Sequence, residues 1–592
     1  MRLPRRTEPV MTTLDGGTLE AVFAEARDPQ RWREPIRNRR IAQQAQAFVD
    51  RALAEASTPI ASPGFRVHHR YDVDGDRTEH SDVYFGIRRR LFAAAIGALL
   101  SDEVPISATE DLIWAICDEY TWALPAHIPE LSSPRPEIPH DEIIDLFSAE
   151  TAFALAEIIA LLGERLHPLL VARAHREIER RVLGPFRDRA WFWETVETNW
   201  SSVCAASVGI AAMYLETDGL EGILDRCTAA MDALLAGYGD DGICIEGLNY
   251  WNYGFGHFAY YAEALRQRTG VDLWAGKDHE KLTAITRYPR NVALGGRAVA
   301  AFSDAEPYGM VTPALAALTE RFDPSNAVPR EFWAAAGWDH NWGPVVRQFA
   351  WARDAADEVT DTETPATWFG DAAWFTARAR SGADEVGFAA KGGDNDEPHN
   401  HNDLGSFVLA VNGDPLLSEL GMGYYDGFYF LPETRYETYS AGAQGHSVPM
   451  IAGVRQHHGR GAAAVVEEVS EEAGRLTLDL TSAYDLGGLQ LVRRTFTFAG
   501  GTLTIDDDFA ADEPVEIVDR LVSLFPIQVT EHGAVIRGDD GALQVTWSEG
   551  WIPRLRSAGF LTHAGDAATA HFLDLERTAS SARCTISAVP VH

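Results

Sequence analysis

The first half of the chain has the hydrophobic spacing of helices. Between about residues 80 and 345, apolar residues recur every three or four positions, which is the period of an amphipathic helix. The pattern predicts helices over 87–103, 108–128, 145–166, 167–186, 201–215, 221–237 and 253–268. The loops between them are short, which favours antiparallel neighbours. We therefore expect a bundle or toroid of helical hairpins.

The second half has the spacing of strands. From about residue 380, apolar and polar residues alternate in short segments, and alternation with period two is typical of half-buried strands. The pattern predicts a hairpin within 405–420 and strands over 475–481, 489–498, 501–509, 515–525 and 542–550. Glycine pairs such as Gly500-Gly501 separate these segments. Many short strands with Gly-rich turns indicate an antiparallel β-sandwich.

This order of elements predicts two domains. A chain of 592 residues is too long for one hydrophobic core. Helices first and strands afterwards favour separate helical and β domains over an interleaved α/β unit. The polar stretch 352–368 marks the change, within a window of 350–385. We predict a multidomain α and β protein, with an α domain over 1–380 and an antiparallel β-sandwich over 381–592.

Composition narrows the functional classes. The net charge of −36 argues against nucleic-acid binding, which requires basic patches. The five cysteines are dispersed and odd in number, so a disulfide framework is not expected. The basic N-terminus is not followed by an apolar segment, and no run of about 18 apolar residues stands out. We therefore expect a cytoplasmic protein without a membrane span, and a homodimer is one option for its assembly.

The segment 391–407 (KGGDNDEPHNHNDLGSF) is the most informative for chemistry. His399 and His401 are two residues apart, so on an extended backbone their imidazoles project to the same side. Such a pair is half of a metal site, or one ligand beside one catalytic group, although it also occurs by chance. The surrounding stretch is too polar for a core strand. Its other polar residues are Asp394, Asp396, Asn400, Asn402 and Asp403.

Further metal ligands are available downstream. Glu419 and His446 lie at the ends of apolar runs, where a side chain can turn inward. Two histidines and one carboxylate are an accepted zinc set, with water or another group in fourth place. The alternative for His446 is an isolated histidine at a strand end.

Two segments of the helical half also carry candidates. Asn199 stands directly before an apolar helix, where an N-cap is the simple alternative. Residues 240–265 form a Gly-rich aromatic turn that leads into a helix, and an aromatic core stripe is the alternative there. The candidates in this turn are Glu246, Tyr250, Trp251, Tyr253 and His257.

Three stretches together resemble the heparinase II/III superfamily of polysaccharide lyases, which includes related alginate lyases. They are ETNWSSVCAASVGIA, DGICIEGLNYWNYG, and the 391–407 segment with its continuations LLSELGMG and GHSVPMIAG. The resemblance spans roughly residues 140–455. It implies an N-terminal (α/α) toroid of helical hairpins followed by a C-terminal antiparallel β-sandwich, with the active site between them.

The resemblance also implies residue roles. Asn199 and His399 would neutralise a substrate carboxylate, and Tyr250 would be the catalytic base and acid, with Tyr253 as the alternative. Tyr436 would add a third hydroxyl. The predicted substrate contacts are Trp200, Glu246, Trp251 and Arg435, and the predicted zinc ligands are His401, Glu419 and His446. Two positions depart from the family pattern, which usually has His at position 200 and Asp at position 419.

The chemistry of β-elimination calls for these residue types. The reaction removes the C5 proton beside a carboxylate and expels the oxygen at C4, so donors that face the carboxylate stabilise the developing anion. One tyrosine serves as base and acid in a syn arrangement if positive charge lowers the pKa of its phenol. Elimination needs no metal-activated water, so zinc would order the loop that carries His399.

We therefore predict a lyase that acts on uronic-acid oligosaccharides or polysaccharides, and we favour exo-type action on short chains. Two alternatives stay open. One is a toroidal glycoside hydrolase that uses a carboxylate pair such as Asp241 and Glu246. The other is an inactive relative that binds zinc or glycan, which Trp200 keeps open. A C4–C5 double bond that absorbs in the near ultraviolet distinguishes the lyase from both.

Overall fold

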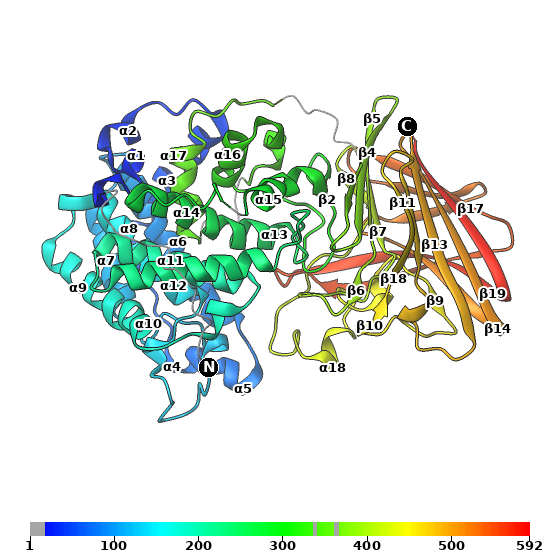
Figure 1. Cartoon of the computed structure of the whole chain (residues 1–592), viewed down its shortest axis with the longest axis horizontal. Coiled ribbons are helices and arrows are strands. Elements are labelled where there is room, and N and C mark those ends of the chain that lie inside the picture. Colours follow the sequence, from blue (N-terminus) through cyan, green and yellow to red (C-terminus); the bar gives the residue numbers. More distant parts are fainter. Residues whose placement is uncertain (1–17, 277, 335–339, 360–365, 592) are drawn as a thin grey trace.

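The computed structural model describes residues 18–276, 278–334, 340–359 and 366–591. A helical body and a β body lie side by side along the longest axis of the molecule (Figure 1). The helices come first in the chain and the sheets afterwards, as predicted.

The longer helices of the first body are α3 (Arg39–Glu55), α6 (Thr78–Leu100), α7 (Ile106–Cys117), α8 (Leu146–Leu162), α9 (Pro168–Ile178), α11 (Asn199–Leu215), α12 (Leu220–Ala236), α14 (Gly256–Thr269), α15 (His279–Val292), α16 (Pro313–Phe322) and α17 (Trp342–Trp351). Helix α11 is buried along almost its whole length and packs against α8, α12 and α14. Helix α8, with the turn after it, is a 20-residue apolar segment with a mean hydropathy of 1.7. Because 78% of that stretch is buried inside the protein, it is a core helix of the body.

Two predicted helices have different bounds, and proline accounts for the second. The predicted 108–128 helix ends at Cys117, and only a 3₁₀ turn, η2 (Pro125–His127), follows. The predicted 167–186 helix continues from α9 through a π turn, η5 (Glu179–Leu183), into α10 (Gly184–Asp188). Pro185 has no N–H to donate and its ring crowds the preceding turn, so regular α geometry is interrupted there.

The β body consists of two large antiparallel sheets. The smaller has the order β3 (Thr367–Phe369), β4 (Trp374–Ser381), β5 (Asp384–Lys391), β7 (Phe407–Val411) and β8 (Asp414–Leu417). The larger has the order β11 (Val465–Ser470), β12 (Arg475–Asp479), β13 (Leu489–Ala499), β14 (Thr502–Ser523), β19 (Ala567–Pro590), β17 (Ala542–Trp547), β16 (Gly533–Arg537) and β15 (Ile527–Thr530). Two strands branch from this path, β18 (Ile552–Leu561) on β19 and β9 (Met450–Ile451) on β14.

Aromatic side chains from both sheets fill the core between them. Phe388 of β5 lies 5.5 Å from Phe496 of β13, measured between ring centroids. Two predictions need correction here. The strands predicted over 501–509 and 515–525 are one strand, β14, whose pairing with β19 shifts between Ala510 and Val515. The predicted boundary at residue 381 falls at the end of β4, so the first strands begin earlier, at Thr367.

Besides the side-chain contacts described below, the backbones of the two bodies pack closely at two separated places. The short hairpin of β1 (Ala293–Gly295) and β2 (Ala298–Val299) packs on β5, where Gly387 leaves room for the Leu294 carbonyl. At the second place, the chain just after α5 (Arg70–Asp74) meets a loop of the β body. The backbones of Gly75 and Gly427 lie in contact there. These two contacts frame the junction at which the candidate residues meet.

Candidate functional site at the domain junction

One carboxylate organises the junction. Asp304 lies in the loop after β2, in the helical body, and its side chain has no exposed surface. It accepts hydrogen bonds from five side chains of the β body, which together with it we call the Asp304 cluster. The donors are His399 Nδ1 at 2.7 Å, His401 Nε2 at 3.0 Å, Tyr425 OH at 2.8 Å, Tyr429 OH at 2.6 Å and Arg435 Nη2 at 3.2 Å.

These donors keep Asp304 ionised. Burial alone would raise the pKa of this carboxyl, because it disfavours the charged form. Hydrogen bonds from His399 and His401 and the charge of Arg435 outweigh burial and hold the pKa of Asp304 well below its usual value. A buried negative charge therefore stands at the centre of the junction.

Tyr250 reaches this cluster from the opposite side. It ends the short helix α13 (Leu248–Tyr250), which follows Gly247 at a φ of 96° and leads into the π turn η7 (Trp251–Phe255). Its hydroxyl lies 3.4 Å from His399 Nδ1 and 3.1 Å from the Tyr425 hydroxyl. The Tyr250 and His399 rings are 4.4 Å apart between centroids. The structure thus brings together the phenol and the imidazole that the sequence motifs single out.

The electrostatics of Tyr250 differ from the expectation. Burial and the charge of Asp304 raise the pKa of the Tyr250 phenol well above its usual value. The expected role as base and acid requires positive charge to lower this pKa, and no sequence motif indicated a buried carboxylate beside the ring. Glu246 stands on the other face of His399, 3.6 Å from its Nε2 atom, and burial raises the pKa of that carboxyl as well.

The other candidates of the helical body lie around the same turn. Tyr253 faces away from His399 and donates to Glu150 at 3.0 Å. Asn199 is the first residue of α11 and is buried, while Thr198 holds the N-cap position. A Cβ at Gly254 would lie 3.2 Å from the Asn199 Cβ, so α11 backs directly onto the turn that carries Tyr253. Trp200 is half-buried.

Two predicted substrate residues have other surroundings. Trp251 has no exposed surface and donates to the Ile285 carbonyl at 2.9 Å, so it is a core residue that cannot contact a sugar. Arg435 is 5% exposed, and its Nε and Nη2 atoms donate to the Asn400 carbonyl and Asp304, while its Nη1 atom is buried without a hydrogen-bond partner in the described part of the chain.

The third hydroxyl predicted for the site, that of Tyr436, does not belong to the Asp304 cluster. The Tyr436 ring stacks on His458, with 5.2 Å between centroids. The hydroxyls that do reach Asp304 belong to Tyr425 and Tyr429. Both lie in the stretch GYYDGFYFL (423–431), whose density of aromatic residues was the available signal.

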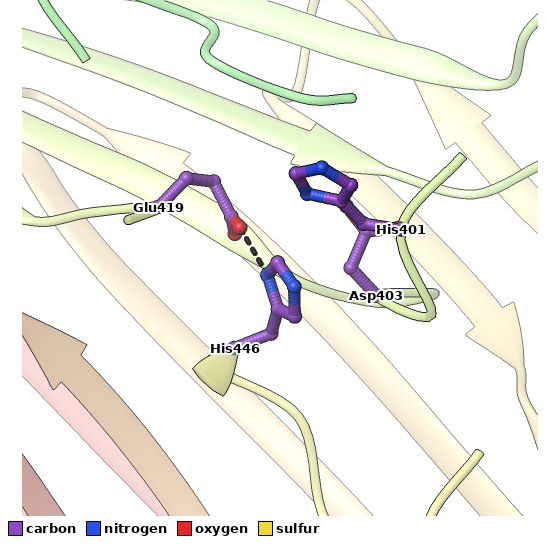
Figure 2. A group of neighbouring side chains, drawn as sticks. All are labelled: His401, Asp403, Glu419 and His446. Carbon is purple, nitrogen blue, oxygen red and sulfur yellow. Dashed lines mark hydrogen bonds and ion pairs between the residues drawn. The ribbon is translucent and has the colours of Figure 1, made fainter. Parts of the chain in front are cut away.

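A candidate metal centre lies on the far side of His401. Figure 2 shows its four members: His401 and Asp403 from one loop, and Glu419 and His446 from two other segments that converge on it. All are buried, and one ligand atom from each lies within 4.8 Å of all the others. Three were predicted as ligands. Asp403 is the addition, and its other oxygen accepts from the buried Lys391 ammonium at 2.7 Å.

The chemistry of this centre fits a zinc ion. Two imidazoles and two carboxylates are ligands that zinc accepts. His446 Nε2 and Asp403 Oδ2 are buried, and neither has a hydrogen-bond partner within the described part of the chain. Such orphaned polar atoms are costly unless a ligand satisfies them.

Comparisons with solved structures identify the fold of this chain. The fold is that of polysaccharide lyases with an (α/α) toroid and a β-sandwich. Heparinase III is 14% identical, with a TM-score of 0.65 over 98% of this chain and 92% of that one. Heparan sulfate lyase HepC from Pedobacter heparinus is 11% identical, with a TM-score of 0.57 over 94% and 84%. Streptomyces coelicolor A3 chondroitin AC lyase is 12% identical, with a TM-score of 0.57 over 95% and 82%.

A family match covers most of the β body. Residues 361–585 match the family described as Heparinase II/III-like, C-terminal. The resemblance and the predicted fold class are thereby confirmed. A comparison with curated proteins gives no match. At these identities, the solved structures establish the fold of the chain.

Proposed function

We propose that this protein is a polysaccharide lyase that cleaves uronic-acid glycans by β-elimination. The observation that carries the proposal is the approach of the Tyr250 hydroxyl to His399, 3.4 Å apart across the domain junction. The neighbours of the same fold are named as lyases of heparan sulfate and chondroitin.

In the proposed reaction, His399 and Asn199 face the uronate carboxylate and stabilise the anion that forms as the C5 proton leaves. The Tyr250 oxygen takes that proton, the bond from C4 to its oxygen breaks, and the departing oxygen regains a proton from the same phenol. Because the pKa of Tyr250 is raised in the protein alone, its phenolate is not a resting state. Tyr250 therefore has to release its phenol proton to solvent as substrate binds, and the phenolate that remains accepts the C5 proton.

Tyr425 orients the phenol for this task. Its hydroxyl donates to Asp304 at 2.8 Å, so its oxygen is left to accept the hydrogen of Tyr250 at 3.1 Å. The chain of hydrogen bonds fixes where the Tyr250 oxygen points before substrate arrives.

We further propose that His401, Asp403, Glu419 and His446 hold one zinc ion. The support is the convergence of their ligand atoms and the two orphaned atoms among them. When bound, the ion supplies a fixed positive charge that ties these loops together, and elimination requires no metal-bound water. The substrate we favour is an oligosaccharide, with exo-type cleavage.

The hydrolase alternative has less support. Asp241 accepts the backbone N–H groups of Ile243 and Asp371, whereas Glu246 faces His399. The two carboxylates thus serve different partners, and a glycosidase needs both beside one bond.

The test is a panel of alginate, heparan sulfate and chondroitin sulfate polymers and oligosaccharides, followed at the absorbance of the C4–C5 double bond. We expect an absorbing product from at least one substrate. Tyr250→Phe should lower that rate by about 10³-fold or more, because it removes the proton acceptor. Tyr288→Phe is the matched control, since Tyr288 is buried and donates to the Cys244 carbonyl. New reducing ends without absorbance would identify a hydrolase instead.

A further inference from the structure

We infer that Asp304 is a positioning residue that couples the proposed zinc centre to the elimination site by orienting both His399 and His401. The inference rests on the proposed function and adds a residue that no sequence motif marks. Asp304 belongs to the helical body, whereas every side chain it orients lies within the segment that matches the heparinase II/III-like family.

The hydrogen bonds fix the tautomers of both imidazoles. An ionised carboxylate only accepts, so each ring nitrogen that it contacts must carry the hydrogen. His399 therefore carries it on Nδ1 and His401 carries it on Nε2. The lone pair of His401 is left on Nδ1, the atom available for a metal. A carboxylate behind a metal-bound imidazole fixes the ring and raises its basicity.

The two carboxylate oxygens of Asp304 accept hydrogen bonds from different sets of side chains. Oδ2 serves the elimination side, with His399 at 2.7 Å and Tyr425 at 2.8 Å. Oδ1 serves the metal side, with His401 at 3.0 Å and Tyr429 at 2.6 Å. Since one rigid group carries both oxygens, a displacement at one side moves the other. The ring of His446 lies 5.3 Å from that of His401, which continues the connection into the zinc centre.

The backbone conformation of His399 gives the hydrogen bond from its ring to Asp304 additional importance. His399 has a φ of 57°, in the left-handed region that a non-glycine residue occupies at a cost of about 1–2 kcal/mol. The hydrogen bond to Asp304 holds the ring where this backbone presents it. We therefore expect His399 to lose its position when the carboxylate is lost.

The experiment compares Asp304→Asn with wild type in two assays. The first measures kcat and KM on the best substrate, and the second measures zinc affinity by competition with a chromogenic chelator. The amide cannot accept on its nitrogen, so one imidazole loses its partner. We expect kcat to fall by about 10²-fold with KM little changed, and zinc affinity to fall by about 10–100-fold.

Asp574→Asn is the matched control, because Asp574 is a buried carboxylate of the β body that is paired with Arg520. It should lose stability but keep kcat and zinc affinity per folded molecule. If Asp304→Asn does not fold, Asp304→Glu carries the test, since it keeps the charge and moves both oxygens by one methylene. Either folded variant with kcat and zinc affinity within about twofold of wild type would overturn the inference.

The two proposals fail differently. A wild-type protein that forms no unsaturated product from any substrate contradicts the lyase proposal, while the zinc assay still measures whether Asp304 positions His401. A variant that loses turnover but keeps full zinc affinity contradicts the coupling and leaves the lyase proposal intact.

Discussion

Two buried carboxylates, Glu157 and Asp304, show how differently one chemical group is used within this molecule. Glu157 lies in α8 with no exposed surface, and it accepts from Tyr214, Trp342 and both terminal nitrogens of Arg347. All of these partners belong to the helical body. Asp304 is equally buried, but all five of its donors come from the other body.

The difference lies in the donors. The bidentate partner of Glu157 is an arginine, which keeps its proton at every accessible pH and so makes a permanent pair. Asp304 is surrounded mainly by imidazoles and phenols, which exchange protons and present a second polar atom elsewhere. A buried carboxylate with arginine stabilises one domain, whereas a buried carboxylate with histidine and tyrosine can align chemistry between two.

The largest expected effect would come from breaking the structural carboxylate. Glu157→Ala should lower the free energy of unfolding by about 3–5 kcal/mol, because it leaves the Arg347 charge buried and unpaired. Urea denaturation measures the loss. Activity and zinc content per folded molecule should stay at wild-type values. A specific loss of turnover would contradict the view that Glu157, unlike Asp304, is a purely structural carboxylate.

Zinc removal should have the next largest effect. Chelation should lower stability by about 2–4 kcal/mol, as expected when a site saturated at about 100–1,000 times its Kd is emptied. Differential scanning calorimetry with and without added zinc measures the shift, and metal analysis should return one zinc per chain. His446→Ala should melt at the same temperature with and without the chelator. An unchanged wild-type melting temperature would contradict the zinc proposal.

A smaller effect concerns pH at the junction. Burial and the charge of Asp304 raise the pKa of Glu306 to about 7. The folded protein therefore holds a proton that the unfolded chain releases near its usual pKa, so this contribution to stability is present at low pH and is lost as the pH rises through about 7. We expect wild type to lose about 2 kcal/mol between pH 5 and 8 relative to Glu306→Gln. Parallel pH profiles for the two proteins would contradict this assignment.

The smallest effect would separate two donors of the Asp304 cluster. Tyr429→Phe removes a hydroxyl that is hydrogen-bonded to Asp304, at a cost of about 1 kcal/mol in stability and little in turnover. Tyr425→Phe should also lower turnover, because that hydroxyl touches Tyr250 as well as Asp304. Equal rates for the two variants would show that Tyr425 does not orient the phenol.

The features that could be predicted from the sequence are those that a local residue pattern determines. Helices α8 and α11 were predicted almost to the residue, because their apolar spacing is continuous. His401 stood out through its spacing from His399, and Glu419 and His446 because they lie at the ends of apolar runs. Long-range pairing could not be predicted in this way.

Asp304 is the clearest such case. It is a single acidic residue in an ordinary loop, and its partners lie between 95 and 131 positions further along the chain. Nothing local distinguished Trp251, a core residue, from the half-buried Tyr250 on the same turn. The continuity of β14 escaped prediction as well, since its register shift lies where the pattern lapses.

The meeting of Gly75 and Gly427 has a mechanical consequence. A Cβ at Gly427 would lie 3.0 Å from the Gly75 Cα, and Gly75 itself has a φ of 76°, so a larger residue at either position would strain this contact or push the two backbones apart. Two bodies fastened at one point can rock about it, whereas further fastenings remove that freedom. The glycine contact, the hairpin of β1 and β2 on β5, and the Asp304 hydrogen bonds together hold Tyr250 against His399.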